Sequence, residues 1–454
     1  MTPAARVQAR IEVLEAILAG EAPADRVLGD YTRARRYMGS KDRRAVVAGT
    51  YDVLRHRARL AWWCGRVFKD DTAPTSRSLT IAALALLEGL PGAGIAALFD
   101  GSAYHPAPLS EAEQGLARDL DGQDLAHEAQ DQATRLEMPD WLRPHLEAAF
   151  GTDLESEMAA LNREAPTDLR VNTLKADREA ARAALAAEGI AAAPLAVAPL
   201  ALRLEARAPI QNTRAFREGL IEVQDAGSQI AAHLTAVAPG MAVADLCAGA
   251  GGKTLALAAA MENRGRLVAL DIDQARLDRA ATRLRRAGAT LVERQVLRGT
   301  DWLEAQAGRF DRVLVDAPCS GSGAWRRDPF ARWQVNAERL ARYGQAQADS
   351  LGAAAGLLAP DGRLIYVTCS LLPEENEVRL EAFLRTRSDF TLLPAERVWQ
   401  ETLGRLGAAP PRPAPFAERF LRLTPARHGT DGFFVAILER GGLEGGGLER
   451  GGPA

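Results

Sequence analysis

The sequence has little cysteine, almost no lysine and no long apolar segment. Four cysteines in 454 residues are too few for a disulfide framework. They form no CxxC pair and have no nearby histidine, so we expect no bound metal. No run approaches the roughly 18 uncharged apolar residues of a membrane span, and the N-terminus lacks a signal-peptide pattern. We therefore expect a cytoplasmic protein with no membrane partner.

Lysine is rare because nearly all of the basic residues are arginine. It occurs only at Lys41, Lys69, Lys175 and Lys253, so a position that keeps lysine can indicate a need for an ammonium group. Residues 1–69 carry 14 basic and 7 acidic side chains, although the whole chain has a net charge of −3. This excess favours a polyanionic partner such as RNA. A solvated, arginine-rich helix face would explain the same composition.

Residues 1–137 are predicted to form an all-α domain. Apolar residues such as Val7, Ile11, Leu14 and Ile17 recur at three- and four-residue spacing, which is typical of an amphipathic helix. A basic helix is expected to run from Asp42 to Trp63, and a mostly buried helix from Ser76 to Leu87. A helical bundle with exposed arginines can bind RNA or only keep the protein dissolved, and the composition does not decide between the two.

Residues 138–236 are predicted to form a small α+β module. A strand is expected at 170–175 with alternating polar positions, followed by a helix at 178–188 and a strand region rich in proline and alanine. Further along, a short strand leads into a helix after Gly219. The module has the size of a small domain.

Residues 237–440 alternate between strands and helices, which predicts a doubly wound, Rossmann-like α/β domain. The expected strands are 243–247, 266–271, 290–292, 312–315, 363–367 and 433–438, and the expected helices include 275–287 and 374–387. The tail at 441–454 repeats Gly-Gly-Leu-Glu and is predicted to be disordered.

Two cysteines follow two of these strands closely. Asp316 directly follows the strand at 312–315 and is followed by Ala-Pro-Cys319, whereas Cys369 comes shortly after the strand at 363–367. The carboxyl ends of parallel strands meet at one edge of an open sheet, where such folds bind their ligands. Thiols in this place suggest chemistry, although most free cysteines are buried small hydrophobes. That second interpretation is the better one for Cys64, and both remain open for Cys247.

A glycine-rich loop follows the first strand of the α/β domain. The end of this loop resembles a phosphate-binding P-loop, but Cys247 stands where that motif requires its first glycine. Thr254 likewise occupies the third glycine position of a dinucleotide-binding motif. Asp271 ends the second strand, where a carboxylate can accept hydrogen bonds from the ribose of an adenosine-containing ligand.

Together these motifs resemble the RsmB/Sun-type RNA cytosine carbon-5 methyltransferases. The matching motifs are DLCAGAGGKT at 245–254, LDID at 270–273, DAPCSGSG at 316–323, RRDP at 326–329, TCSLLPEEN at 368–376 and HGTDGFFVA at 428–436. Residues 170–172 and 222–225 resemble motifs that precede the catalytic domain of this family. The N-terminal helices resemble the NusB-like domain that accompanies its RsmB subgroup. The similarity covers nearly the whole chain.

The resemblance implies a monomeric enzyme that uses S-adenosylmethionine to methylate cytosine in RNA. Small-subunit ribosomal RNA is the favoured substrate and transfer RNA is the alternative. Carbon 5 of cytosine is a poor nucleophile, so a thiolate must first add at carbon 6. The resemblance gives this role to Cys369. It also implies that Asp316 meets the nitrogen-3 edge of the ring and that Cys319 acts in releasing the adduct.

The implied cofactor-binding residues are Cys247, Ala248, Gly249, Ala250, Gly251, Gly252, Lys253, Asp271, Asp301 and Asp316. Two positions depart from the family pattern. Ala250 replaces a proline that many members have, and Gly299-Thr300-Asp301 replaces the usual Gly-Asp. Lys253 is expected to stabilise charge in the pocket, or only to be solvated at a helix N-terminus.

Two alternatives remain open at this point. DNA cytosine methyltransferases place their nucleophile in a Pro-Cys motif, which would make Cys319 the nucleophile instead of Cys369. A non-catalytic RNA-binding assembly factor could also keep this fold. The two cysteines and the carboxylates argue against the second alternative.

Overall fold

The computed structural model describes residues 1–454 except 21, 70–72, 412–415, 418 and 442–454. The predicted disorder of the tail at 441–454 thus falls almost entirely outside the described residues. The chain divides into two compact units. The first contains residues 1–164 and 324–336, and the second contains 165–323 and 337–454.

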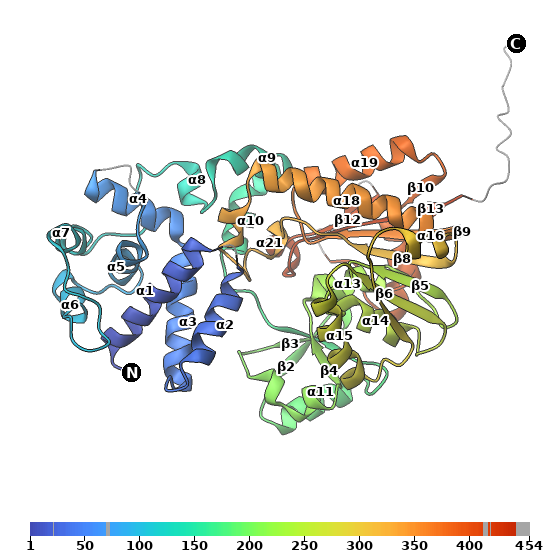
Figure 1. Ribbon diagram of the computed structural model, residues 1–454, viewed down its shortest axis with the longest axis horizontal. Coiled ribbons are helices and arrows are strands. Elements are labelled where there is room, and N and C mark those ends of the chain that lie inside the picture. Colours follow the sequence, from blue (N-terminus) through green and yellow to red (C-terminus); the bar gives the residue numbers. More distant parts are fainter. Residues whose placement is uncertain (21, 70–72, 412–415, 418, 442–454) are drawn as a thin grey trace, which may run out of the picture. The chain divides into compact units, whose positions relative to one another are not determined.

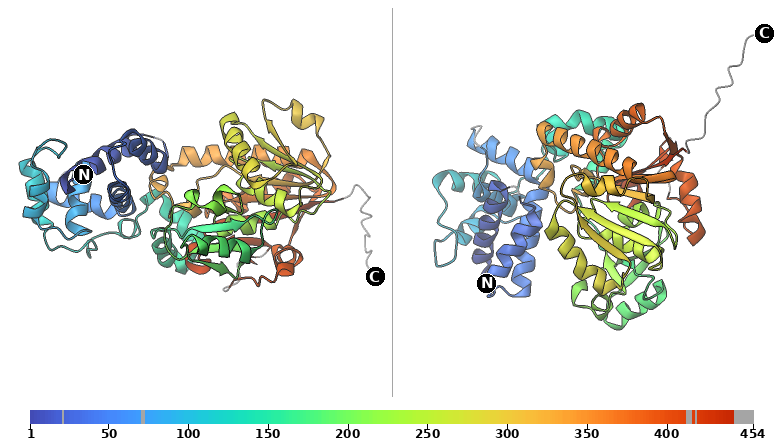
Figure 2. Two further views of the ribbon diagram at one scale, coloured as in Figure 1. Left: turned by 90° about the horizontal axis from the view of Figure 1, so that it is seen from below. Right: turned by 45° about the vertical axis from the view of Figure 1, so that its right-hand side comes forward.

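The first unit is helical, as its blue-to-cyan part shows in both views of Figure 2. Its helices are α1 Pro3–Ala19, α2 Ala24–Ala34, α3 Ser40–Arg55, α4 Arg57–Phe68, α5 Ser76–Leu86, α6 Gly92–Leu98, α7 Glu111–Asp119, α8 Gln132–Arg135, η1 Asp140–Leu142, α9 Arg143–Phe150, η2 Gly151–Asp153, α10 Leu154–Leu161 and α17 Ala331–Gln334. The apolar stripe of α1 is buried as its periodicity predicts. Within the described residues, no helix is long and apolar enough to cross a membrane.

The helix predicted from Asp42 to Trp63 is wrong in one respect, because it breaks between α3 and α4 at His56. The break is fixed by a residue far along the chain. The buried carboxylate of Glu137 accepts hydrogen bonds from Ala58 N (2.7 Å) and from Arg59 Nε (2.8 Å) at the start of α4. An acid at a helix N-terminus satisfies its free N–H groups, so α4 begins where Glu137 holds it.

The second unit begins with a small antiparallel sheet in the order β2-β3-β1-β4. Its elements are β1 Asp168–Val171, α11 Arg178–Ala187, β2 Ala192–Leu195, β3 Ala198–Leu204, η3 Ile210–Asn212, α12 Arg214–Arg217 and β4 Ile221–Val223. The strand predicted at 170–175 starts earlier and ends at Val171, and all four residues of β1 are buried rather than alternating. Beyond Val171 the chain turns, with Lys175 N donating to Asn172 O at 3.0 Å. Asn172 Nδ2 donates to the carbonyls of Gly219 and Ala287, both at 2.8 Å, and anchors this turn.

The rest of the second unit is a larger mixed sheet in the order β11-β12-β13-β9-β8-β5-β6-β7, with β10 paired to β13 (Figure 1). Its strands are β5 Ala242–Leu246, β6 Arg266–Asp271, β7 Val292–Val296, β8 Phe310–Asp316, β9 Leu358–Thr368, β10 Phe390–Leu393, β11 Phe416–Ala417, β12 Phe420–Leu423 and β13 Phe433–Arg440. Strands β9, β8, β5, β6 and β7 are parallel, whereas β13 is antiparallel to β9. This confirms the predicted Rossmann-like α/β fold.

The helices of this unit are α13 Ala226–His233, α14 Gly252–Ala260, α15 Gln274–Ala287, α16 Asp301–Ala305, η4 Ser322–Ala324, α18 Ala337–Leu357, η5 Pro373–Glu375, α19 Glu377–Thr386, α20 Ala395–Glu401, η6 Gly404–Leu406 and α21 Pro425–His428. Apolar side chains of the central strands are buried on both faces of the sheet. The predicted strand at 290–292 lies later, at β7, because Thr290 N donates to the Asn263 side chain and pairing with β6 begins at Val292.

Candidate functional site

The two cysteines predicted at one sheet edge lie side by side. Strands β8 and β9 are parallel neighbours, with Asp316 opposite Val367, so both loops leave the sheet at the same edge. The sulfur atoms of Cys319 and Cys369 are 3.5 Å apart. Each side chain is half-buried. A flat ring placed at this edge can therefore meet both thiols.

The two thiols of this pair are not equivalent. The contact with Cys369 and the burial of the side chain raise the pKa of Cys319 well above its ordinary value. The two sulfur atoms lie within hydrogen-bonding distance, and either thiol can be the donor.

A buried carboxylate that sequence reasoning missed, Glu375, braces the two cysteine loops. It accepts hydrogen bonds from Ser320 N at 2.8 Å and from the hydroxyls of Ser320 and Ser370, each at 2.5 Å. Ser320 and Ser370 directly follow the two cysteines. Burial raises the pKa of the Glu375 carboxyl, although the serine hydrogen bonds lower it. The match to TCSLLPEEN contained this residue, but nothing in the pattern showed what it contacts.

A second link between the loops uses only glycine backbone. Gly323 N donates to Cys369 O at 2.9 Å, and Gly432 N donates to Gly323 O at 2.8 Å. A Cβ atom on Gly323 would lie 2.3 Å from Gly432 O, so only glycine fits there. The loop that carries Cys319 is therefore held against the start of β13 as well as against β9.

Asp316 forms an ion pair with Lys253. The Lys253 ammonium lies 2.7 Å from Asp316 Oδ2 and 5.4 Å from the centre of the Phe433 ring. Lys253 is only 7% exposed, so its ammonium is not solvated at the helix N-terminus. Burial lowers its pKa, but the Asp316 carboxylate outweighs this effect and raises it. The predicted pocket residue thus holds a permanent positive charge beside Asp316.

The glycine loop turns sharply between β5 and α14. Cys247, Gly249 and Gly251 have φ values of 65°, 57° and 79°, which glycine adopts easily and cysteine rarely does. Burial raises the pKa of the Cys247 thiol to about 12, so this thiol stays protonated and neutral at neutral pH. Gly251 also needs to be glycine because a Cβ there would lie 3.1 Å from the Cβ of Ala280.

Asp271 holds this loop in place. Its Oδ2 accepts from Gly249 N and its Oδ1 from Asp273 N, both at 2.8 Å. A carboxylate has about four acceptor sites, so two remain for the hydroxyls of a ribose. The loop and Asp271 therefore fit the adenosine part of S-adenosylmethionine. Asp301 is exposed at the first position of α16, and its predicted role stays a prediction.

A further buried acid lies beneath the loop. Asp245, on β5, is fully buried and accepts a hydrogen bond from Thr254 Oγ1 at 2.5 Å. Burial raises the pKa of this carboxyl to about 7. Sequence reasoning missed it as well, because the motif alone gives no burial.

The basic surface predicted for residues 1–69 is present in part. Arg36, Arg43 and Arg44 are exposed, on or just before α3. Arg35 lies instead 3.0 Å from Glu12 and stacks on the ring of Tyr31 at 3.5 Å. Arg35 therefore stabilises the helical unit, and the other three remain available for a polyanion.

Fold and site together define a class. A Rossmann-like domain that carries a glycine loop and a strand-end carboxylate at one sheet edge is typical of methyltransferases. The family model described as 16S rRNA methyltransferase RsmB/F matches residues 232–439. A model described as the ferredoxin-like domain of the same family matches residues 138–211.

Similar proteins agree with this class. The ribosomal RNA small subunit methyltransferase B of Salmonella newport (strain SL254) is 32% identical over 366 residues, which cover 78% of this chain and 85% of the relative. The chain belongs to the RsmB/F family of rRNA methyltransferases. Its fold is similar to the crystal structure of PH0851, with a TM-score of 0.75, 25% identity and coverage of 97% and 99% of the two chains. A methyltransferase homologue from Pyrococcus horikoshii has a TM-score of 0.57 and 29% identity, and the match covers 68% of this chain and 97% of that one.

Proposed function

We propose that the protein methylates carbon 5 of a cytosine in small-subunit ribosomal RNA. The observation that carries this proposal is the pair of thiols, 3.5 Å apart, beside the Lys253–Asp316 ion pair. Carbons 5 and 6 of a pyrimidine are bonded neighbours, so two adjacent thiols can serve both. The names of the curated relatives favour ribosomal RNA as the substrate.

The first step is addition of the Cys369 thiolate to carbon 6 of the base. A sulfur–carbon bond forms, and the electrons of the ring double bond become available at carbon 5. Asp316 meets the nitrogen-3 edge, and the Lys253 ammonium, which lies 2.7 Å from Asp316 Oδ2, offsets the negative charge that develops there. When bound at the glycine loop and Asp271, S-adenosylmethionine supplies an electrophilic methyl group.

The release step suits Cys319. The contact with Cys369 raises the pKa of Cys319, and so does the burial of its side chain. Once Cys369 is bonded to carbon 6 it is a neutral thioether, so its part of this effect is removed while that of burial stays. After the Cys319 thiol has lost its proton to solvent, the thiolate takes the carbon 5 proton, the ring double bond re-forms and the Cys369 thiolate leaves. In this proposal Cys369 is the nucleophile of the first step and Cys319 the base of the last.

Trapping of the covalent adduct tests this assignment. In Cys319→Ala, the Cys369 thiolate should still add to carbon 6 and the methyl group should be transferred, but the adduct should not be released. A protein–RNA species that survives SDS and disappears with RNase should then accumulate. Cys369→Ala and the double variant should form no adduct and incorporate no tritium from labelled cofactor. Cys64→Ala, at a buried thiol in the helical unit, is the matched control and should behave like the parent.

The opposite result has a clear meaning. An adduct in Cys369→Ala that is lost in Cys319→Ala would establish the DNA-type order of roles. No methyl transfer by the parent protein to any RNA would favour the non-catalytic assembly factor. Bisulfite sequencing of ribosomal and transfer RNA from a deletion strain would then identify the modified cytosine and decide between the two RNA classes.

A further inference from the structure

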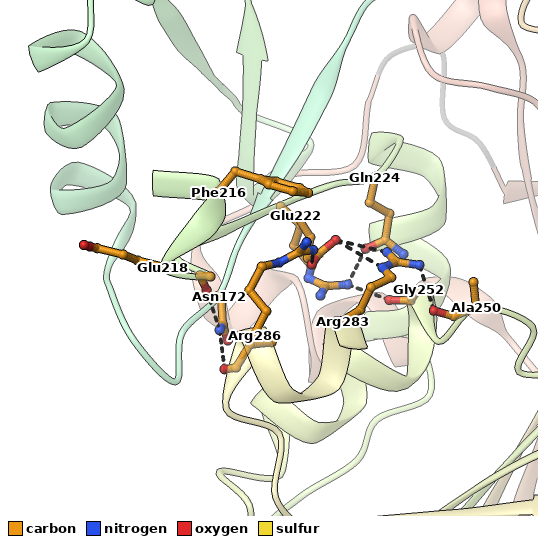
Figure 3. Close-up of polar contacts among 12 residues, drawn as sticks. Asn172, Phe216, Glu218, Glu222, Gln224, Ala250, Gly252, Arg283 and Arg286 are labelled. Atoms are coloured by element: carbon orange, nitrogen blue, oxygen red, sulfur yellow. Dashed lines mark hydrogen bonds and ion pairs between the residues drawn. The ribbon is translucent and has the colours of Figure 1, made fainter. Parts of the chain in front are cut away.

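Two arginines, Arg283 and Arg286, pair with the buried carboxylate of Glu222 near the glycine loop (Figure 3). Glu222, on β4 of the small module, is 3% exposed in its side chain and lies 3.1 Å from Arg283 Nη2. Its other oxygen contacts Arg286. Arg170, on β1, is 2% exposed, and burial lowers its pKa to about 10, so it stays charged at neutral pH. The cluster therefore holds more positive than negative charge.

Two of these guanidinium groups donate to the backbone of the glycine loop. Arg283 Nη1 donates to Ala250 O, and Arg170 Nη1 donates to Gly252 O, each at 2.8 Å. Arg170 also donates to the side chain of Gln224. These carbonyls flank Gly251, one of the loop residues with positive φ. The contacts therefore fix two peptide planes of the loop from elements outside it.

The chemistry of Arg170 favours positioning over stability. Its hydrogen-bond acceptors, the Gln224 side chain and Gly252 O, are neutral, and its Nε is buried without a partner. Burying a charge with neutral acceptors costs free energy that an apolar side chain of similar volume would avoid. The small module thus keeps a costly cation at the point where it can reach the loop.

We propose that Arg170 and Arg283 are positioning residues for the cofactor, and that the small module sets the conformation of the cofactor loop through Arg170. This inference rests on the proposed use of S-adenosylmethionine. Asp271 holds Gly249 N and the two arginines hold the carbonyls of Ala250 and Gly252, so the loop is arranged before the cofactor arrives. Such preorganisation lowers the free-energy cost of binding.

The loop itself provides a test that needs no cofactor. In Arg170→Met, hydrogen exchange of the amides at 249–254 should become faster in the free protein. Arg178→Met is the matched control, because Arg178 is a half-buried arginine of the same module that donates to Pro199 O at 3.0 Å, away from the loop. Equal exchange of the loop amides in the parent and in Arg170→Met would overturn the proposal.

Binding and kinetics test the same point with a ligand. We expect Arg170→Met and Arg283→Met to weaken binding of S-adenosylhomocysteine by about tenfold, the effect of losing one hydrogen bond from a charged group. KM for S-adenosylmethionine should rise equally, kcat at saturating cofactor should change little, and Arg170→Lys should recover part of the affinity. Arg178→Met should bind like the parent.

The possible outcomes separate this inference from the proposed function. Parent-like affinity in Arg170→Met, at any melting temperature, would show that the arginine is only structural and would overturn the inference alone. No binding of S-adenosylhomocysteine by the parent protein would overturn the cofactor assignment together with the inference. A loss of kcat with unchanged KM for cofactor would also contradict a role in positioning the cofactor.

Discussion

Removing the Glu375 carboxylate should separate the two cysteine loops. This side chain is completely buried and accepts from the residue after each cysteine, so it links β8 and β9 at their reactive ends. Gln347 Nε2 also donates to it, at 3.2 Å. Glu375→Ala leaves a cavity and removes the acceptor of the Ser320 amide. Glu375→Gln keeps the volume and one acceptor oxygen.

The expected cost follows from these contacts. A large-to-small substitution in a packed interior costs about 2–5 kcal/mol. An orphaned buried donor such as Ser320 N adds about 1–3 kcal/mol, whereas the serine hydroxyls can turn toward each other, since their oxygens are 3.3 Å apart. We therefore expect Glu375→Ala to lose about 3–8 kcal/mol. Glu375→Gln should lose less, about 1–2 kcal/mol. Its amide can donate to a serine hydroxyl, and the free-energy cost of burying a charge is removed.

Urea unfolding and single-turnover methyl transfer check this prediction together. Glu375→Gln should stay folded but form the carbon 6 adduct more slowly, since the spacing of the thiols is less constrained. Glu381→Ala is the control, because Glu381 is exposed on the next helix and should change stability by less than about 0.5 kcal/mol. Parent-like stability and adduct formation in Glu375→Ala would refute the brace.

Three further perturbations test other parts of the molecule. Asp271→Ala should weaken binding of S-adenosylmethionine by about ten- to hundredfold in calorimetry, from the lost acceptor and the released Gly249 amide; unchanged affinity would remove Asp271 from the site. Reversing the charges of Arg36, Arg43 and Arg44 should weaken RNA binding and flatten its salt dependence, with cofactor affinity unchanged. The pKa of Asp245 is raised to about 7 in the folded protein, so between about pH 4 and pH 7 the folded carboxyl is protonated while the unfolded one is ionised. The free energy of unfolding therefore falls as the pH rises from about 4 to about 7. Asp245→Asn should therefore gain up to about 4 kcal/mol at pH 8 and nothing at pH 4 in urea unfolding.

The sheet edge was predictable because it depends on local signals. Apolar runs bounded by turn residues located β5, β6, β8 and β9, and the rule that parallel strands end at one edge placed the two thiols together. The strand at 266–271 was predicted to the residue. The proposed roles of the two thiols came from the family resemblance and still need the adduct experiment.

What the sequence did not reveal depends on contacts between distant residues. Glu375 is a brace only because β9 brings it beneath Ser320, and a glutamate in an acidic Glu-Glu pair gives no sign of burial. The role of Arg170 is similar, since its partner Gly252 lies 82 positions away. Charged residues are rarely buried, so from the sequence they are assigned to the surface.

The segment at 324–336 shows the same limit at the level of domains. It directly follows the DAPCSGSG motif, yet it packs as part of the helical unit. There Arg332 is completely buried and donates to the carbonyls of Glu137 at 2.9 Å and Leu161 at 3.3 Å. Glu137 in turn holds the start of α4. Contacts of Arg332 and Glu137 thus hold the segment at 324–336 in the helical unit. The order of residues along the sequence does not predict this packing. The domain boundaries predicted at 138 and 237 follow the order of motifs along the sequence. In the structure, the RRDP motif at 326–329 packs instead with the N-terminal helices.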